Sequence, residues 1–251
     1  MEKIFSYLIT FVYYFCFGLI LCAFHPIQWI CLNLFGYQAH KKSVDYLNLC
    51  LVRCTHILGT TYKIKNREWA PRGVPVIIVA NHQSMYDIPP IIWFLRRLHP
   101  KFISKKDLGK GIPSVSYNLR HGGSVLINRK DSKQSLSEIK KIAQYIEKNN
   151  RSAVIFPEGT RSKNGQPKKF SENGLKVLYE NAPSAYILPI SISNSWKMVK
   201  FGTFPMGLGN RLIFTLHQPL KVSDYSFEEI FQITEQGIVS GIKLPQSSID
   251  S

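Results

Sequence analysis

The sequence predicts an α/β protein with a mainly parallel mixed sheet covered by helices on both faces, and an N-terminal helical membrane-anchoring element. Short β-branched runs alternate with helical patterns from about residue 60 onward, which is typical of a parallel sheet between helices. The runs at 76–79 and 153–156 are apolar throughout, as expected for strands buried on both faces. A long uncharged stretch precedes all of them.

That stretch covers residues 4–24 and ends at His25 and Pro26. As a helix it would extend roughly 31 Å, the thickness of the hydrocarbon core of a bilayer. A cleaved signal peptide is the alternative, but the apolar run is long for one and no clear Ala-x-Ala site follows it. We therefore expect a membrane element that crosses or only enters the bilayer. Residues 27–35 are too short to cross, so we expect them at the interface or in a re-entrant segment.

The chain after this stretch is basic, beginning with Lys41 and Lys42. Because cytoplasmic segments carry an excess of Lys and Arg, we expect the catalytic part on the cytoplasmic side of a membrane, in particular a bacterial inner membrane. Apolar residues recur at helical spacing between residues 44 and 58. We therefore divide the chain into a membrane-associated helical element at 1–58 and one α/β domain at 59–251.

Within the domain, helices are expected to begin near Asp87, Asp131 and Ser171, where capping residues precede helical patterns or prolines suited to a first turn. In open parallel sheets, binding sites form beyond the carboxyl ends of the strands. The expected strands are residues 62–64, 74–80, 102–104, 124–127, 153–156, 186–192 and 212–216.

The composition of the chain limits the classes of partner and function that it can have. The formal net charge of +16 indicates an anionic partner such as a membrane surface, a phosphorylated substrate, an acidic carrier protein or a nucleic acid. We expect no nucleic acid, because the basic cluster lacks interleaved aromatic residues and the apolar element has no use there. The phosphate-binding loop of nucleotide enzymes, the serine-hydrolase elbow and paired metal-spaced histidines are absent from the sequence, so no metal or cofactor is expected.

The expected strand at 74–80 runs directly into a loop that contains His82 and Asp87. Five residues apart on one helix, the two side chains would point away from each other. A loop followed by a helix start can instead bring the carboxylate to the imidazole, where Asp87 would orient His82 as a general base for an alcohol. The alternative is that Asp87 only caps a helix and His82 is a structural loop residue.

A second polar group follows the strand at 153–156, in the sequence Phe-Pro-Glu-Gly-Thr-Arg-Ser. Gly159 permits a tight turn and Thr160 supplies a hydroxyl. Arg161 offers a planar set of donors suited to phosphate, and Glu158 could orient it. The alternative is a polar turn with a solvated arginine.

Basic residues also follow the strands expected at 102–104 and 124–127, most clearly Lys105 and Arg129. Their place beside the strand ends suggests a funnel for anions, although part of this charge can equally be a solvated face. All five cysteines lie in the first 54 residues, so an acyl-cysteine intermediate in the domain is excluded. Direct attack by an activated alcohol remains.

Taken together, these motifs resemble the glycerolipid acyltransferase family, and most closely its 1-acyl-glycerol-3-phosphate (lysophosphatidic acid) acyltransferases. The resemblance covers roughly residues 60 to 220, and Ser116 departs from it where many members have glycine. Lys105 also matches a basic family position. The resemblance depends on four ordered sequence blocks: Asn81-His82-x4-Asp87, Gly123-x4-Asn128-Arg129, Phe156-Pro-Glu-Gly-Thr-Arg161-Ser and Leu188-Pro189-Ile190.

The resemblance implies that His82, oriented by Asp87, deprotonates the free hydroxyl of a lysophosphatidic acid, which attacks an acyl thioester to give phosphatidic acid in phospholipid biosynthesis. Arg161, with Lys105 and Arg129, would hold the acceptor phosphate. The acyl donor would be acyl-CoA or acyl-carrier protein. Two alternatives stay open: the same chemistry on another lysophospholipid or lyso-aminolipid, and a non-catalytic basic protein that binds anionic lipid at the membrane.

Overall fold

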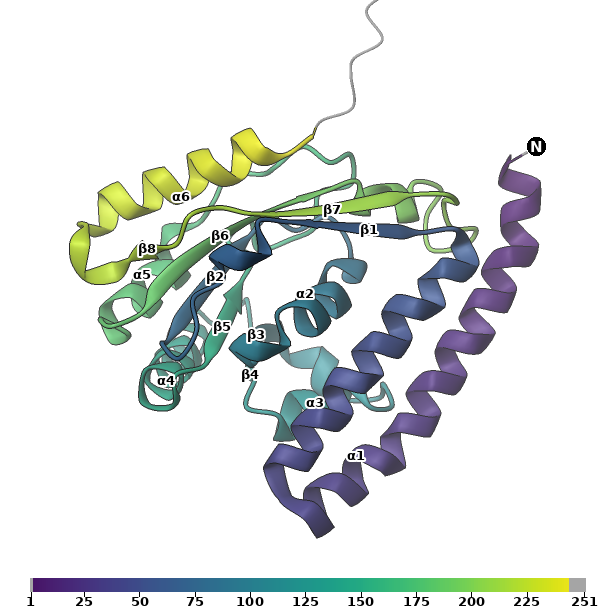
Figure 1. The fold of residues 1–251 in the computed structure, drawn as a ribbon, viewed down its shortest axis with the longest axis horizontal. Coiled ribbons are helices and arrows are strands. Elements are labelled where there is room, and N and C mark those ends of the chain that lie inside the picture. Colours follow the sequence, from purple (N-terminus) through teal and green to yellow (C-terminus); the bar gives the residue numbers. More distant parts are fainter. Residues whose placement is uncertain (1, 244–251) are drawn as a thin grey trace, which may run out of the picture.

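The computed structural model describes residues 2–243, so the last eight residues of the expected domain at 59–251 lie outside the described part. Figure 1 shows a single sheet with helices on both faces and a long helical hairpin at one side. The helices are α1 (Glu2–Cys54), α2 (Ile88–Phe94), α3 (Val115–His121), α4 (Ser132–Asn149), α5 (Glu172–Asn181) and α6 (Phe227–Gly241). The strands are β1 (Thr61–Lys65), β2 (Val76–Ala80), β3 (Pro100–Lys105), β4 (Val125–Ile127), β5 (Ser152–Ile155), β6 (Tyr186–Ser193), β7 (Arg211–Leu216) and β8 (Leu220–Lys221).

The sheet order is β1-β7-β6-β2-β5-β3-β4, and β8 pairs with β6 outside this path. Strands β6, β2, β5, β3 and β4 run parallel to one another, while β7 and β8 are antiparallel to β6. The predicted fold class is therefore confirmed. Because β2, β5, β3 and β4 share a direction, the loops that follow them emerge at one edge of the sheet.

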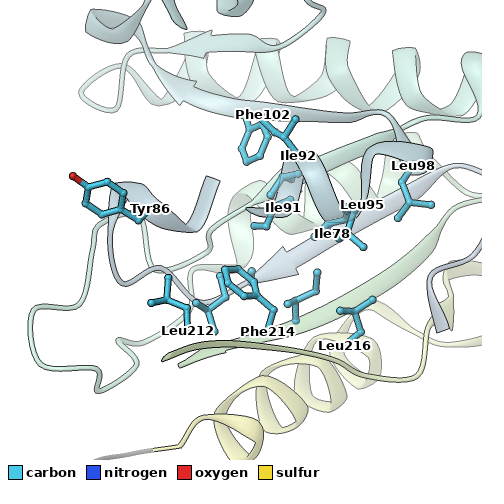
Figure 2. Packing of buried hydrophobic residues seen from close by; sticks show 14 of the residues in the cluster. Ile78, Tyr86, Ile91, Ile92, Leu95, Leu98, Phe102, Leu212, Phe214 and Leu216 are labelled. Carbon is cyan, nitrogen blue, oxygen red and sulfur yellow. The ribbon is translucent and has the colours of Figure 1, made fainter. Parts of the chain in front are cut away.

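The core explains why these strands form a covered sheet. Every residue of β2 is buried, and successive side chains point to opposite faces. Ile78 packs in the cluster that includes α2, whereas Ile77 packs with α4, α5 and α6 on the other face. Figure 2 shows the first cluster, in which Ile91 of α2 and Leu95, the residue after this helix, lie against the strands. Apolar side chains therefore cover both faces of β2, as its unbroken apolar run predicted.

Helix α1 is two antiparallel arms that meet at Gly36. This residue has φ +78° and ψ −175°, a conformation that glycine adopts without steric cost. Figure 1 shows the two arms side by side at the edge of the molecule. The segment 27–35, expected as a separate interfacial element, instead continues the first arm through Pro26.

The first arm packs along the domain with one face. Ser6 Oγ donates to the Met206 carbonyl, Met206 N donates to Thr10 Oγ1 at 2.9 Å, and Tyr14 Oη donates to the Thr203 carbonyl at 2.8 Å. Tyr13 is fully buried in the same core cluster as β2 and β6. The amino-terminal element therefore shares a core with the α/β domain.

Three elements were not among the expected ones: α3, α6 and β8. Helix α6 begins with a capping box, in which the Ser226 hydroxyl accepts from Glu229 N and the Glu229 carboxylate accepts from Ser226 N. That Ser-x-x-Glu spacing is visible in the sequence and was available as a helix-start indication.

Candidate active site

His82 lies in the loop that leaves β2, two residues after Ala80. The chain then turns through a 3₁₀ segment at Met85–Asp87 into α2. His82 Nδ1 lies 2.8 Å from Asp87 Oδ2. A carboxylate only accepts hydrogen bonds, so Nδ1 carries the proton and the lone pair of Nε2 is free to act as a base. The expected loop and helix start thus bring the two side chains together.

Asp87 performs two tasks with one oxygen atom. Besides His82, its Oδ2 accepts from Gln83 N at 2.7 Å and from Ser84 N at 3.0 Å, and the Ser84 hydroxyl accepts from Tyr86 N. This is a capping box on the 3₁₀ segment. The two interpretations of Asp87, helix cap and histidine partner, therefore both hold. With its side chain fully buried, Asp87 has little freedom to move.

The loop after β5 holds the backbone of His82 on both sides. Glu158 Oε1 accepts from His82 N at 2.7 Å, and Ser162 N donates to the His82 carbonyl at 2.8 Å. The Phe156 ring stacks on the His82 ring with centroids 4.1 Å apart. The motifs after β2 and β5, 76 residues apart in sequence, form one structural unit.

Glu158 does not orient Arg161, as the sequence suggested it could. Its second oxygen, Oε2, accepts from Lys168 N at 2.9 Å, so both oxygens are used by backbone donors of its own loop and of the His82 loop. The side chain is 8% exposed. Burial raises the pKa of Glu158, while the two backbone hydrogen bonds and His82 act in the opposite direction. We correct its assignment from substrate contact to positioning of His82.

Two amide side chains beside His82 were missed as positioning groups. Asn81 donates to the Ile192 carbonyl at 2.9 Å and accepts from Ile192 N at 2.7 Å. Gln83 accepts from Ser195 N at 2.9 Å and donates to the Gly165 carbonyl at 3.3 Å. Both side chains are buried. They fasten the His82 loop to the end of β6 and to the loop after β5.

The three predicted cations lie at the same edge of the sheet. Lys105 ends β3, Arg129 follows β4 and Arg161 follows β5, and these strands are neighbours in the order β5-β3-β4. All three side chains are exposed. Lys105 Nζ forms an ion pair with Asp107 Oδ2 at 2.5 Å, an interaction that the sequence analysis did not include. The structure thus places the cations beside the His82 loop without fixing them in it.

The turn that carries Arg161 has the conformation expected from its glycine. Gly159 has φ +65°, and its N–H donates to the Phe156 carbonyl. Gly159 and Thr160 are exposed, so their backbone groups are accessible at the edge where His82 lies. The fourth sequence block, Leu188-Pro189-Ile190, has a structural role. Leu188 and Ile190 are fully buried in β6 and support the sheet.

Ser116 stands where the resemblance implies glycine. Its hydroxyl donates to the Leu108 carbonyl at 2.9 Å and accepts from Ile112 N at 3.0 Å. The serine therefore ties the segment after β3 to the start of α3. The departure from the family pattern adds local hydrogen bonds and leaves the His82 loop untouched.

When a buried carboxylate fixes one imidazole nitrogen and the other nitrogen is free at the ends of parallel strands, the imidazole can remove a proton from a hydroxyl group. In residues 2–243 no cluster of three His, Cys, Asp or Glu side chains is arranged to hold a metal ion. Cations on neighbouring strands suit an anionic substrate. Fold and site together define an α/β enzyme of the kind that transfers a group to an activated alcohol.

Comparison with known proteins gives the family. Residues 61–193 match the family model described as Acyltransferase, and this match covers just over half of the chain. The chain belongs to the acyltransferase family, and the resemblance found in the sequence motifs is confirmed.

Individual relatives agree with this assignment. The chain is 38% identical over 125 residues to a 1-acyl-sn-glycerol-3-phosphate acyltransferase of Helicobacter pylori, covering 49% of this chain and 50% of that protein. It is 28% identical over 206 residues to the Borreliella burgdorferi protein of the same name, covering 81% and 80%. The crystal structure of the 1-acyl-sn-glycerophosphate (LPA) acyltransferase PlsC from Thermotoga maritima superposes with a TM-score of 0.80, at 25% identity and 96% coverage of both chains.

Proposed function

We propose that this chain is a 1-acyl-sn-glycerol-3-phosphate acyltransferase, which moves a fatty acyl group from an acyl thioester to the free hydroxyl of lysophosphatidic acid. The product is phosphatidic acid, an intermediate of phospholipid biosynthesis. The observation that carries the proposal is the His82–Asp87 pair, buried at the end of β2 and held by Glu158 from the loop after β5. The names of the aligned relatives supply the acceptor.

His82 and Asp87 are the proposed catalytic residues. His82 Nε2 takes the proton from the acceptor hydroxyl as its oxygen attacks the thioester carbonyl carbon. Asp87 keeps Nδ1 protonated and stabilises the positive charge on the ring. When the tetrahedral intermediate collapses, the carbon–sulfur bond breaks and the thiolate takes the proton from His82. The ester and a free thiol are the products, and His82 is regenerated.

Substrate contacts are assigned to the exposed groups of the same edge. Arg161, Lys105 and Arg129 hold the phosphate of the acceptor, because cations on three neighbouring strands can approach one anion. The backbone N–H of Thr160 stabilises the thioester oxyanion, whereas that of Gly159 is already used by the Phe156 carbonyl. The donor is acyl-CoA or acyl-carrier protein.

The helical hairpin is the proposed membrane-binding element. Among the described residues, α1 is the one helix long and apolar enough to cross a membrane. Crossing would require its first arm to give up the hydrogen bonds of Ser6, Thr10 and Tyr14 to the domain. We therefore assign it to the surface of the cytoplasmic leaflet, with its outer face in the lipid. That face carries Ile4, Phe5, Leu8, Phe11, Phe15, Leu19, Trp29, Leu34 and Phe35, all exposed.

The activity is tested with purified protein in detergent, acyl-CoA and acyl-carrier protein as alternative donors, and lysophosphatidic acid as acceptor. Release of free thiol together with phosphatidic acid formation is expected, and neither should occur when the acceptor is omitted. Faster turnover of a different lysophospholipid would reassign the acceptor. Absence of thiol release with every donor and acceptor would contradict the enzyme assignment.

The membrane assignment is tested by washing membranes that contain the protein. Salt and carbonate should leave it in the pellet, because apolar burial is insensitive to ionic strength. Leu8→Glu and Phe15→Glu on the exposed face should together increase its release, whereas Ser223→Glu, on the far side of the sheet, should not. Complete release of the unaltered protein by salt would instead indicate an electrostatic attachment.

A further inference from the structure

A second cluster of basic and polar side chains lies at the opposite edge of the sheet from His82. A cleft opens there between the second arm of α1 and the start of β3, lined by His40, Lys41, Asp45, His99, Lys101, Asn118 and Ser124 among others. Lys101 is the second residue of β3, and Lys105 is its last. The two are four residue steps apart along the strand, which is about 13 Å, so this cleft is distinct from the proposed acyl-transfer site.

Positive charge in and around the cleft exceeds negative charge. Lys101 is 6% exposed, and Arg151 donates to Tyr37 Oη nearby. Asp45 is already paired with Lys41. Within residues 2–243, neither Lys101 nor Arg151 has a carboxylate at ion-pair distance. Burial, with Arg151 and Lys41 close by, lowers the pKa of Lys101 to about 7, while Asp45 acts in the opposite direction.

Three ring nitrogens of the cleft histidines have no hydrogen-bond partner among residues 2–243: both of those of His40, which is 1% exposed, and Nδ1 of His99. Burial lowers the pKa of His40 to about 4 and that of His99 to about 3, and Lys101 acts in the same direction on both. Each ring is therefore neutral near pH 7 and carries one N–H group. Buried donors are nearly always paired, so this N–H group is available to an acceptor that enters the cleft.

We propose that this cleft binds a tetrahedral oxyanion of the phosphate class, held by Lys101 and an imidazole N–H of His40. Lys41, which already donates to Asp45 and to the Arg96 carbonyl, adds positive charge beside them. Its cavity of about 20 Å³ has room for one water-sized atom group. One phosphate oxygen enters, and the remainder of the ligand stays at the open mouth.

Two sources can supply this chemistry. One is free phosphate. The other is the headgroup of an anionic phospholipid, because the cleft lies beside Tyr37, next to the hairpin bend where Leu34 and Phe35 are exposed. The proposal is independent of the acyl-transfer activity.

The site is tested by thermal unfolding of the detergent-solubilised protein in sodium phosphate against sodium chloride of equal ionic strength. Phosphate should raise the Tm of the unaltered protein by roughly 2–4 °C more than that of Lys101→Met. The general effect of phosphate on protein hydration is common to both proteins. Lys63→Met is the matched control, because it removes an exposed lysine of the edge strand β1, at the other end of the sheet order from β3, and should keep the full shift.

An equal phosphate-induced shift in the unaltered protein and Lys101→Met would overturn the proposal. The source of the anion is then resolved by sedimentation with vesicles of phosphatidylcholine alone or mixed with phosphatidylglycerol. A headgroup ligand predicts that Lys101→Met loses at least threefold of the preference for phosphatidylglycerol. Unchanged vesicle preference together with a lost phosphate shift assigns the site to free phosphate.

Discussion

At the carboxyl edge of the sheet, His82 and Asp87 lie in a loop closed by buried hydrogen bonds, whereas Lys105, Arg129 and Arg161 lie in solvent on the neighbouring strands. Asp87 is fully buried and bonded to three donors. The side chain of Lys105 is 55% exposed, and its one ion pair within residues 2–243 is with Asp107.

The two regions differ because one removes a proton and the other attracts an anion. A general base has to meet its proton within a hydrogen-bond distance, and small displacements are costly. An anion can be attracted by flexible cations that adjust to it, at the cost of screening by salt. The buried hydrogen bonds of this edge therefore hold the base in place, whereas the cations stay exposed to solvent. The following predictions separate the two regions, from the largest expected effect to the smallest.

Replacing His82 by Ala should reduce kcat by about 10²–10⁴-fold, the usual contribution of a positioned general base. Asp87→Asn should also be strongly impaired, because the amide can no longer accept from Nδ1 and from both backbone donors at once. Circular dichroism and Tm should show that His82→Ala remains folded. Near-normal turnover of either folded variant at saturating acceptor would assign these residues a structural role.

Replacing Glu158 by Ala should reduce kcat by about 10²-fold with little change in KM, because the His82 backbone loses an acceptor and the base shifts. The N–H groups of His82 and Lys168 lose their acceptor, which should also lower the unfolding free energy by about 1 kcal/mol in total, because both bonds are only partly buried and Lys168 is exposed to water. Glu158→Gln retains one carbonyl acceptor and should lie between the unaltered protein and Glu158→Ala. A rise in KM alone, measured with varied lysophosphatidic acid, would return Glu158 to substrate binding.

Replacing Arg161 by Ala should reduce kcat/KM for lysophosphatidic acid at least tenfold, since a hydrogen bond to a charged group contributes about 1.5–3 kcal/mol. The loss should be much smaller for a monoacylglycerol, which has no phosphate. Lys should be a poor replacement because it lacks the planar set of donors. Measuring both acceptors with both proteins completes a double-mutant cycle. Equal losses on both acceptors would show that the phosphate is held elsewhere.

Replacing Asp107 by Asn should change kcat/KM by no more than about threefold, because water and salt screen an exposed ion pair and it contributes little. The change should be an increase, since Lys105 is released to the acceptor phosphate. Asp224→Asn, on the other side of the sheet, serves as the matched control and should have no effect. A loss of more than tenfold would place Asp107 among the positioned groups instead of the solvated ones.

Local pattern was enough to predict the sheet and the centre of the site. Strands β2 and β5 are read from unbroken apolar runs, because burial on both faces leaves no place for polar side chains. The meeting of His82 with Asp87 follows from a strand, a loop and a helix start within a few residues. Each of these depends on neighbours in the chain, so the sequence by itself contains the information.

Long-range contacts were decided by the tertiary structure. The acceptors and donors of Asn81 and Gln83 are backbone groups more than 80 residues away, and backbone groups leave no pattern in a sequence. Glu158 was assigned to Arg161 because the two are neighbours in the chain, yet packing of β5 beside β2 gives it the His82 N–H.

The amino-terminal element shows the same division. Apolar composition determined that residues 4–24 form a helix suited to lipid. The bend at Gly36 and the hydrogen bonds of Ser6 and Thr10 to Met206 depend on the surface against which the helix packs. Composition adds up all residues of the segment and therefore indicates only that the helix suits lipid. Whether it crosses a membrane or lies against the domain depends on a few polar side chains that find hydrogen-bond partners on the domain surface.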